Sequence, residues 1–171
     1  PVSACPIPEA TQLEPGRIAA ASFWDSYRAP LIQTGLSMPE LFAAIFAHHP
    51  AWVKVLLIAR NRAMARLGAE VATDSQIWTL DLKPAYAVGD TIGPWPIFTL
   101  TGTELIAGRD NSHLDFRVSL LKTLAPTPNV TVTTVCNVHT AFGHTYLATI
   151  KPFHRWGVRA LLQRAQAAGR I

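Results

Sequence analysis

The stretch His113-Leu114-Asp115-Phe116-Arg117-Val118-Ser119-Leu120 alternates strictly between polar and apolar side chains. Successive side chains of a β-strand point to opposite faces of its sheet, so this pattern predicts a strand with one apolar face in the core. The other face carries His113, Asp115, Arg117 and Ser119. The pattern leaves open whether that polar face meets solvent or lines a pocket.

Further β-rich segments surround this strand along the chain. They lie at residues 97–100, 103–107, 130–138 and 144–150, and turn-forming residues separate them. Such short intervals predict an antiparallel meander. Residues 17–28 are also β-prone and predict a first strand, which Pro30 ends.

Two helices are predicted between the first strand and the meander. Ser37-Met38-Pro39-Glu40 has the Ser-x-x-Glu pattern of a capping box, with proline in the first turn, where its missing N–H costs nothing. Apolar residues at helical spacing follow Pro50 as far as Gly68, which predicts the second helix.

A closing helix is predicted after Lys151-Pro152. Phe153, Trp156, Ala160 and Leu161 recur at helical spacing and form one apolar stripe. We expect this stripe to face the sheet, with a cavity between the helix and the polar row of residues 113–119. His154 is expected in the first turn of this helix.

Length and composition predict one domain. The chain has 171 residues, of which 49% are hydrophobic and 15% charged, enough for a sizeable core. Residues 1–16 contain four prolines and predict an extended N-terminal arm, so the domain is expected to span residues 17–171. The element order places the chain in the α+β class.

Several classes of protein are excluded by what the sequence lacks. It has no apolar run long enough to cross a membrane, no visible signal peptide, and no basic-aromatic strand motif for nucleic acid, so a cytoplasmic location is expected. Nucleotide-binding glycine motifs and the hydrolase elbow are absent, and no cofactor is predicted. Its two cysteines form no CxxC motif. The oligomeric state stays open between a monomer and a homodimer.

Local motifs resemble a known family. Asp110-x-x-His113-Leu114-Asp115-Phe116, Thr133-x-Val135, Gly143-x-x-Tyr146 and Pro152-Phe153-His154 are similar to the pattern of the bacterial DUF2867 domain family, and Asp25-x-Tyr27 and Arg60-Asn61 add to it. The element order also resembles the START-like, or helix-grip, architecture. That resemblance implies a sheet wrapped around a long C-terminal helix, with a cavity between them.

Proton-transfer chemistry is one hypothesis for the polar strand face. His113 and Asp115 lie roughly 7 Å apart at Cβ, from two residues of strand rise, which allows a relay. An imidazole near a carboxylate is suited to general acid–base catalysis. A solvent-facing polar row is the alternative. His139, His144 and Asp115 could form a metal set, but no metal-binding spacing of histidines is present, and no metal is predicted.

The remaining candidates would contact a ligand. Arg60 interrupts an apolar helix, which predicts an inward ion pair or a bound carboxylate. The predicted ligand-binding residues are Tyr27, Arg60, Asn61, Arg117, Thr133, Asn137, Tyr146 and Trp156.

Three functions follow from these patterns and from the resemblance. The first is binding of a small hydrophobic or aromatic metabolite, of lipid or polyketide type, in the cavity. The second is a cofactor-independent enzyme, such as a cyclase, dehydratase or isomerase, with His113 and Asp115 as catalytic residues. The third is an accessory domain for a reductase, which the fusions known in the family imply.

Overall fold

An antiparallel sheet organises the part of the chain that this computed structural model describes, which is residues 1–48 and 82–171. The order of its seven strands is β1-β2-β7-β6-β5-β4-β3. The strands are β1 (Ser3–Ala4), β2 (Phe23–Pro30), β3 (Thr91–Ile92), β4 (Trp95–Leu100), β5 (Glu104–Arg109), β6 (Leu114–Thr123) and β7 (Asn129–Val138). Helices and this sheet together confirm the α+β class.

The predicted meander is confirmed from β4 to β7, where each strand pairs with the next along the chain. The first predicted strand is right only in its second half. Helix α1 (Pro15–Ala19) occupies the start of that segment, because Pro15 can begin a helix, and β2 follows at Phe23. β2 pairs with β7, so the first long strand lies beside the last one.

The predicted capping box is present at the start of α2 (Met38–Phe46). The Ser37 hydroxyl accepts a hydrogen bond from the backbone N–H of Glu40, and the Glu40 carboxylate accepts one from the backbone N–H of Ser37. Leu41, Phe42 and Ile45 are buried by this helix, as its apolar stripe predicts. The second predicted helix, with Arg60 and Asn61, lies outside the described residues.

The last helix begins earlier than predicted. Residues 144–150 are not a strand, because α5 runs from Ala141 to Ala167 without a break at Pro152. The Thr140 hydroxyl caps the helix by accepting from the Gly143 N–H. A Cβ at Gly143 would overlap the carbonyl oxygen of His113, so glycine lets this first turn lie against the start of β6.

The face of α5 that meets the sheet also differs from the prediction. Trp156 is 60% exposed and Phe153 is 72% exposed, so the two aromatic members of the predicted stripe point away from the sheet, whereas Leu161 packs against the main core. The sheet-facing stripe is instead formed by Gly143, Leu147, Ile150, His154, Val158, Leu162 and Ala165. His154 breaks the apolar character of this stripe, which is why the aromatic stripe gave the stronger pattern.

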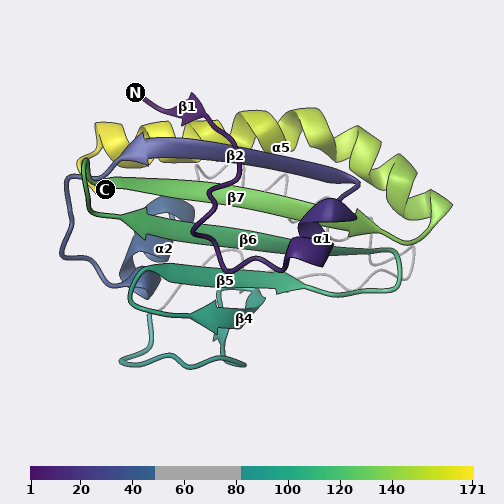
Figure 1. Cartoon of the computed structure of the whole chain (residues 1–171), viewed down its shortest axis with the longest axis horizontal. Helices are drawn as coiled ribbons and strands as arrows, with labels where there is room; N and C mark the ends of the chain where they lie inside the picture. Colours follow the sequence, from purple (N-terminus) through teal and green to yellow (C-terminus); the bar gives the residue numbers. More distant parts are fainter. Residues whose placement is uncertain (49–81) are drawn as a thin grey trace.

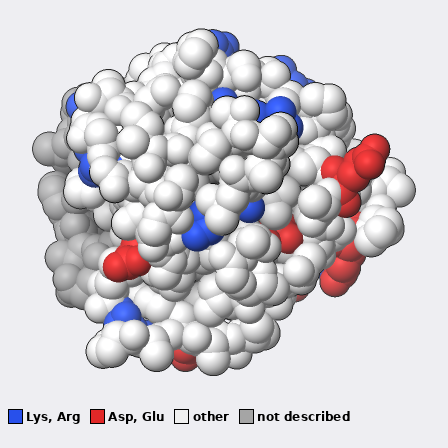
Figure 2. Space-filling view, turned by 60° about the vertical axis from the view of Figure 1, so that its left-hand side comes forward, with Lys and Arg blue, Asp and Glu red and all other residues white. Residues whose placement is uncertain are grey.

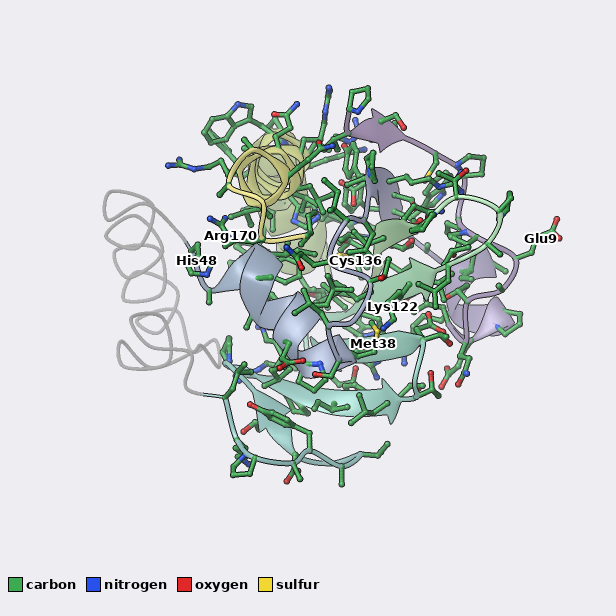
Figure 3. The ribbon with its side chains drawn as sticks, turned by 90° about the vertical axis from the view of Figure 1, so that its left-hand side faces the viewer. Glu9, Met38, His48, Lys122, Cys136 and Arg170 are labelled. Carbon is green, nitrogen blue, oxygen red and sulfur yellow. The ribbon has the colours of Figure 1, made fainter. Side chains whose placement is uncertain are left out.

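Each face of the sheet has its own cover. α2 and α5 pack on one face, called the helix face here, where Val118 and Leu120 of β6 join the main core. The N-terminal arm crosses the opposite face, called the arm face, in front of β2, β7 and β6 in Figure 1. Leu13 of the arm is only 4% exposed and packs on Ile106 and Val135. Figure 3 shows α2 and α5 on one side of the strands and the arm on the other, with Glu9 extending away from the arm.

A membrane span would require a long apolar helix, and a continuous basic face would require lysine and arginine to gather on one surface. None of the helices described here combines the length and the apolar composition that a bilayer crossing needs. On the face drawn in Figure 2, lysine and arginine form separate small patches.

Candidate ligand site

A buried carboxylate lies between the sheet and α5. Asp25, in the middle of β2, is 6% exposed, and its side chain points to the helix face together with those of Phe23 and Tyr27. Its partner across the strand pair is Thr134 of β7, which is also buried. The polar residue of the α5 stripe, His154, lies over both.

Asp25 is not satisfied by its surroundings. Neither Oδ1 nor Oδ2 accepts a hydrogen bond within the described part of the chain. Its one ion-pair contact among the described residues is with His154, whose Nε2 is 3.4 Å from Asp25 Oδ1. A buried carboxylate normally accepts several hydrogen bonds, so Asp25 is an exception that calls for an explanation.

The His154 ring is held by three contacts. Its Nε2 is 3.1 Å from the Thr134 hydroxyl, and the Phe23 ring packs edge-on against it at 5.7 Å between centroids. With Asp25, these contacts fix the imidazole beside the carboxylate. Imidazole and carboxylate together form a unit that can accept and donate protons.

Asp25 contributes to pKa shifts of two neighbouring side chains on the helix face. Burial, and then Asp25, raise the pKa of Tyr27 above its usual range, while Arg155 and Arg159 oppose that shift. Burial, assisted by Asp25, raises the pKa of the Cys136 thiol to about 12. Both side chains therefore stay protonated at neutral pH and add no further negative charge around Asp25.

A groove lies beside this carboxylate, whose two oxygens are themselves covered. It has a volume of about 830 Å³, and Asp25 is among its lining residues. Its walls come from residues 4–6 of the arm, residues 21–27 around the start of β2, and Lys151 and Arg155 of α5. β1 pairs only with Tyr27 and Arg28, so the edge of β2 from Phe23 to Asp25 is open toward the groove.

The groove has an aromatic wall and a cationic rim. Trp24 is 46% exposed, and Phe23 lies beneath Lys151 Nζ and Arg155 Cζ, each 5.3 Å from the ring centroid. No ion pair joins either cation to a residue in the described ranges, and α5 contains no Asp or Glu. The site therefore combines an acidic floor, an aromatic wall and a basic rim.

The polar row of β6 lies on the arm face, away from this groove. Asp115 of this row pairs with Asn137, one of the predicted ligand-binding residues, in the register of β6 and β7. Asn137 donates from Nδ2 to the backbone oxygen of Arg17, and the Arg17 guanidinium is 3.7 Å from Asp115. A cavity between Asp115, Arg117 or Ser119 and α5 is therefore the wrong arrangement, since α1 and the N-terminal arm cover this side of β6 and α5 packs on the opposite face.

His113 and Asp115 have separate partners. His113 Nδ1 is 3.1 Å from the Thr140 hydroxyl, and its ring packs on Phe142. Asp115 Oδ2 is instead 2.9 Å from Nε2 of His139, and Asp115 Oδ1 accepts from the Asn111 N–H. Within the described ranges, no group of three or more His, Cys, Asp or Glu residues is arranged to hold a metal ion.

Arg117 is committed to an ion pair on the arm face. Its guanidinium donates to both carboxylate oxygens of Asp110, at 2.6 and 2.9 Å, and stacks on the Phe98 ring at 3.5 Å. The Arg117 hydrogen bonds hold the pKa of Asp110 below its usual range. These contacts use the fork and the flat face of the guanidinium, which a ligand would otherwise need.

The other predicted ligand residues are spread over the molecule. Thr133 lies on the arm face, 2.9 Å from the Ser26 hydroxyl, whereas Tyr27 lines the groove. Tyr146 is on α5 instead of a strand, and Trp156 lies on the outer side of α5. Arg60 and Asn61 lie outside the described residues. Tyr27 is thus the one predicted residue that the structure places at the groove among those it describes.

Asp25 and His154 belong to the motifs that suggested the family, but neither was predicted as a site residue. A signal for each exists in the sequence. Asp25 is the acidic member of the alternating set Phe23, Asp25, Tyr27 and Ala29. His154 is the polar member of the stripe at positions 147, 150, 158 and 162. One polar residue in each of two apolar sets marks where the two elements meet.

Comparison with known proteins gives one match. No curated protein and no solved structure shows significant similarity to this chain. The model of the family described as "Protein of unknown function (DUF2867)" matches residues 17–161, which include β2, the whole meander and α5 as far as Leu161. The chain therefore belongs to the DUF2867 family.

Proposed function

We propose that this protein binds a small molecule with an apolar or aromatic body in the groove between β2 and α5. The observation that carries the proposal is Asp25, a buried carboxylate that lines the groove and accepts no hydrogen bond from the described residues. Leaving a buried polar group unpaired costs about 1 to 3 kcal/mol, and more for a charged one. A ligand that donates to Asp25 would offset that cost.

The size and lining of the groove support this function. Ligand pockets typically measure a few hundred to about 1,000 Å³ and combine apolar walls with a few polar groups. The groove has this volume, with Phe23 and Trp24 as aromatic surface and Asp25 as the polar group. The arrangement of sheet and C-terminal helix is compatible with the helix-grip, START-like architecture. We place the ligand of this protein beside α5, the closing helix of that arrangement.

A fluorescent aromatic alcohol, 2-naphthol, tests the proposal. We expect saturable binding to the wild-type protein and about fivefold weaker binding to Trp24→Ala, since an aromatic contact contributes roughly 1 kcal/mol. Phe153→Ala is the matched control, because it removes an exposed aromatic ring outside the groove. Equal affinities in the two variants, or binding that does not saturate, would refute the proposed site.

A proton-transfer enzyme is the second candidate, and the contact between His154 and Asp25 favours it. In this version the acid–base pair is Asp25 with His154, in place of the pair expected from the sequence, His113 with Asp115. Molecules that co-purify with the protein can be identified by native mass spectrometry. An enzyme would convert such a molecule, and His154→Gln would bind it without converting it. A binding protein would release it unchanged in both cases.

A further inference from the structure

We propose that the ligand of this groove is an amphipathic acid: an aromatic or apolar body with an anionic group at one end and a hydrogen-bond donor at the other. This inference rests on the proposed function and adds the chemical class of the ligand. It follows from the two opposite charges that the groove presents at different depths.

The floor of the groove selects a donor. An ionised carboxylate has only acceptor sites, so Asp25 can be satisfied by an O–H or N–H group but not by an ether, ketone or carboxylate. His154 does not fulfil this role, because its Nε2 lies 3.1 Å from the Thr134 hydroxyl and reaches Asp25 only at 3.4 Å, on the Oδ1 side. Asp25 Oδ2 has no donor from the described residues.

The rim of the groove selects an anion. Lys151 and Arg155 stand over the Phe23 ring on the same side of α5, and no ion pair within the described ranges neutralises them. The helix that carries them has no acidic residue, so their charge is not compensated from α5 itself. A carboxylate or phosphate at the rim would bind both cations.

The positions of Lys151 and Arg155 relative to Asp25 favour a short ligand. Lys151 precedes His154 by three residues and Arg155 follows it by one, so their Cα atoms lie roughly 4.5 and 1.5 Å along the helix axis from that of His154, whose imidazole is beside Asp25. We therefore expect a ligand in which one or two fused rings separate the donor from the anion. A simple cation would meet repulsion at the rim, and an acid without a donor would leave Asp25 unpaired.

Three probes built on the same naphthalene ring separate the two requirements. 2-Naphthoate has the anion alone, 2-naphthol has the donor alone, and 6-hydroxy-2-naphthoate has both. We expect 6-hydroxy-2-naphthoate to bind the full chain about tenfold more tightly than either of the others, the effect of one hydrogen bond or ion pair to a charged group. The advantage conferred by the carboxylate should decrease as salt is added.

Variants assign each advantage to its residue. Asp25→Leu keeps the approximate shape of the side chain and should abolish the preference for the hydroxyl, while the double variant Lys151→Gln/Arg155→Gln should abolish the preference for the carboxylate. Arg164→Gln removes a cation from α5 outside the groove and should change neither. Asp25→Asn, which weakens the acceptor without removing it, replaces Asp25→Leu if circular dichroism shows that the latter is unfolded.

The outcomes distinguish this inference from the proposed function. If 2-naphthol binds as tightly as 6-hydroxy-2-naphthoate, the ligand needs no anionic group, although binding in the groove stands. If 2-naphthoate binds as tightly as 6-hydroxy-2-naphthoate, the ligand needs no hydrogen-bond donor. Absence of binding for all three probes would overturn both the ligand class and the proposed function.

Discussion

Two carboxylates are buried on opposite faces of one sheet, and they differ in the hydrogen bonds that they accept. Glu104, on the arm face, is 1% exposed, and three groups donate to it: the hydroxyls of Thr11 and Ser119, each at 2.5 Å, and the Gln12 N–H at 2.7 Å. Asp25, on the helix face, is 6% exposed and receives no hydrogen bond from the described residues. The two carboxylates are thus buried to a similar degree but differ in the number of hydrogen bonds that they accept.

The difference separates a structural group from a functional candidate. Two of the three donors to Glu104 come from the N-terminal arm, so this carboxylate attaches the arm to the sheet. A buried carboxylate that already accepts three hydrogen bonds, with both of its oxygens engaged, has little capacity left for a ligand. Asp25 has that capacity and lines a groove. Burial alone would have marked both residues equally.

The largest expected effect is on Glu104. Glu104→Ala removes the acceptor of three donors in or near the core, and we expect it to lower the free energy of unfolding by about 3 to 5 kcal/mol, measured by urea denaturation. The arm should also detach, so trypsin should cleave after Arg17 faster than in the wild type. Thr11→Val, which removes one donor, should cost only about 1 kcal/mol.

A loss below about 1 kcal/mol for Glu104→Ala would contradict this prediction. It would mean that solvent reaches the carboxylate and that the arm adds little to stability.

Asp25 should respond with the opposite sign. Asp25→Asn removes an unsatisfied buried charge, and we expect stability to stay equal or to rise by about 1 to 2 kcal/mol in the same urea experiment, as is common when a functional group is replaced. Binding of 6-hydroxy-2-naphthoate should weaken at the same time. A loss of 3 kcal/mol or more would show that Asp25 is structural like Glu104, and the comparison would fail.

The sequence predicted much of what local patterns determine. Alternation over residues 113–120 and 130–138 predicted two neighbouring strands, and the capping box at Ser37 predicted the start of α2, because each signal lies within a few residues. The start of α5 was missed because Thr and Gly, the residues at positions 140 and 143, are favoured in turns as well as near helix starts. Only the contact of Gly143 with His113, distant in sequence, distinguishes the two.

The candidate site was harder to predict because it depends on pairing. Whether Asp25 meets His154 follows from β2 lying beside β7 and from the rotation of α5, and neither is encoded locally. The same holds for Asp115, which lies beside His139 and not His113. Register brings together residues that strand alternation alone cannot assign to each other.

The ion pair between Asp110 and Arg117 on the arm face should make stability depend on pH in the acid range. Hydrogen bonds from Arg117 lower the pKa of Asp110 from its ordinary value of 3.8, so this pair stabilises the protein above about pH 4 and the contribution is lost as the pH falls through the lowered pKa. Asp110 is half-exposed, so solvent screens the pair and the contribution is about 1 kcal/mol or less. Asp110→Asn should be less stable than the wild type at pH 7, and urea denaturation at pH 3 and below should bring the two together.

An undiminished difference between the wild type and Asp110→Asn at that pH would show that the stabilisation arises from packing of Arg117 on Phe98 and not from the charge of Asp110.

The smallest effect concerns the two thiols and requires no mutation. Cys136 lies on the helix face, 7% exposed, and its pKa of about 12 leaves roughly one thiol in ten thousand ionised at pH 8. Cys5 is partly exposed and lines the groove. In the native protein, iodoacetamide should therefore modify Cys5 alone, as located by peptide mass spectrometry, and both thiols should react in urea. Because Cys5 lies on the groove wall, 6-hydroxy-2-naphthoate should slow its modification. Rapid modification of Cys136 in the native protein would instead show that α5 separates from β7.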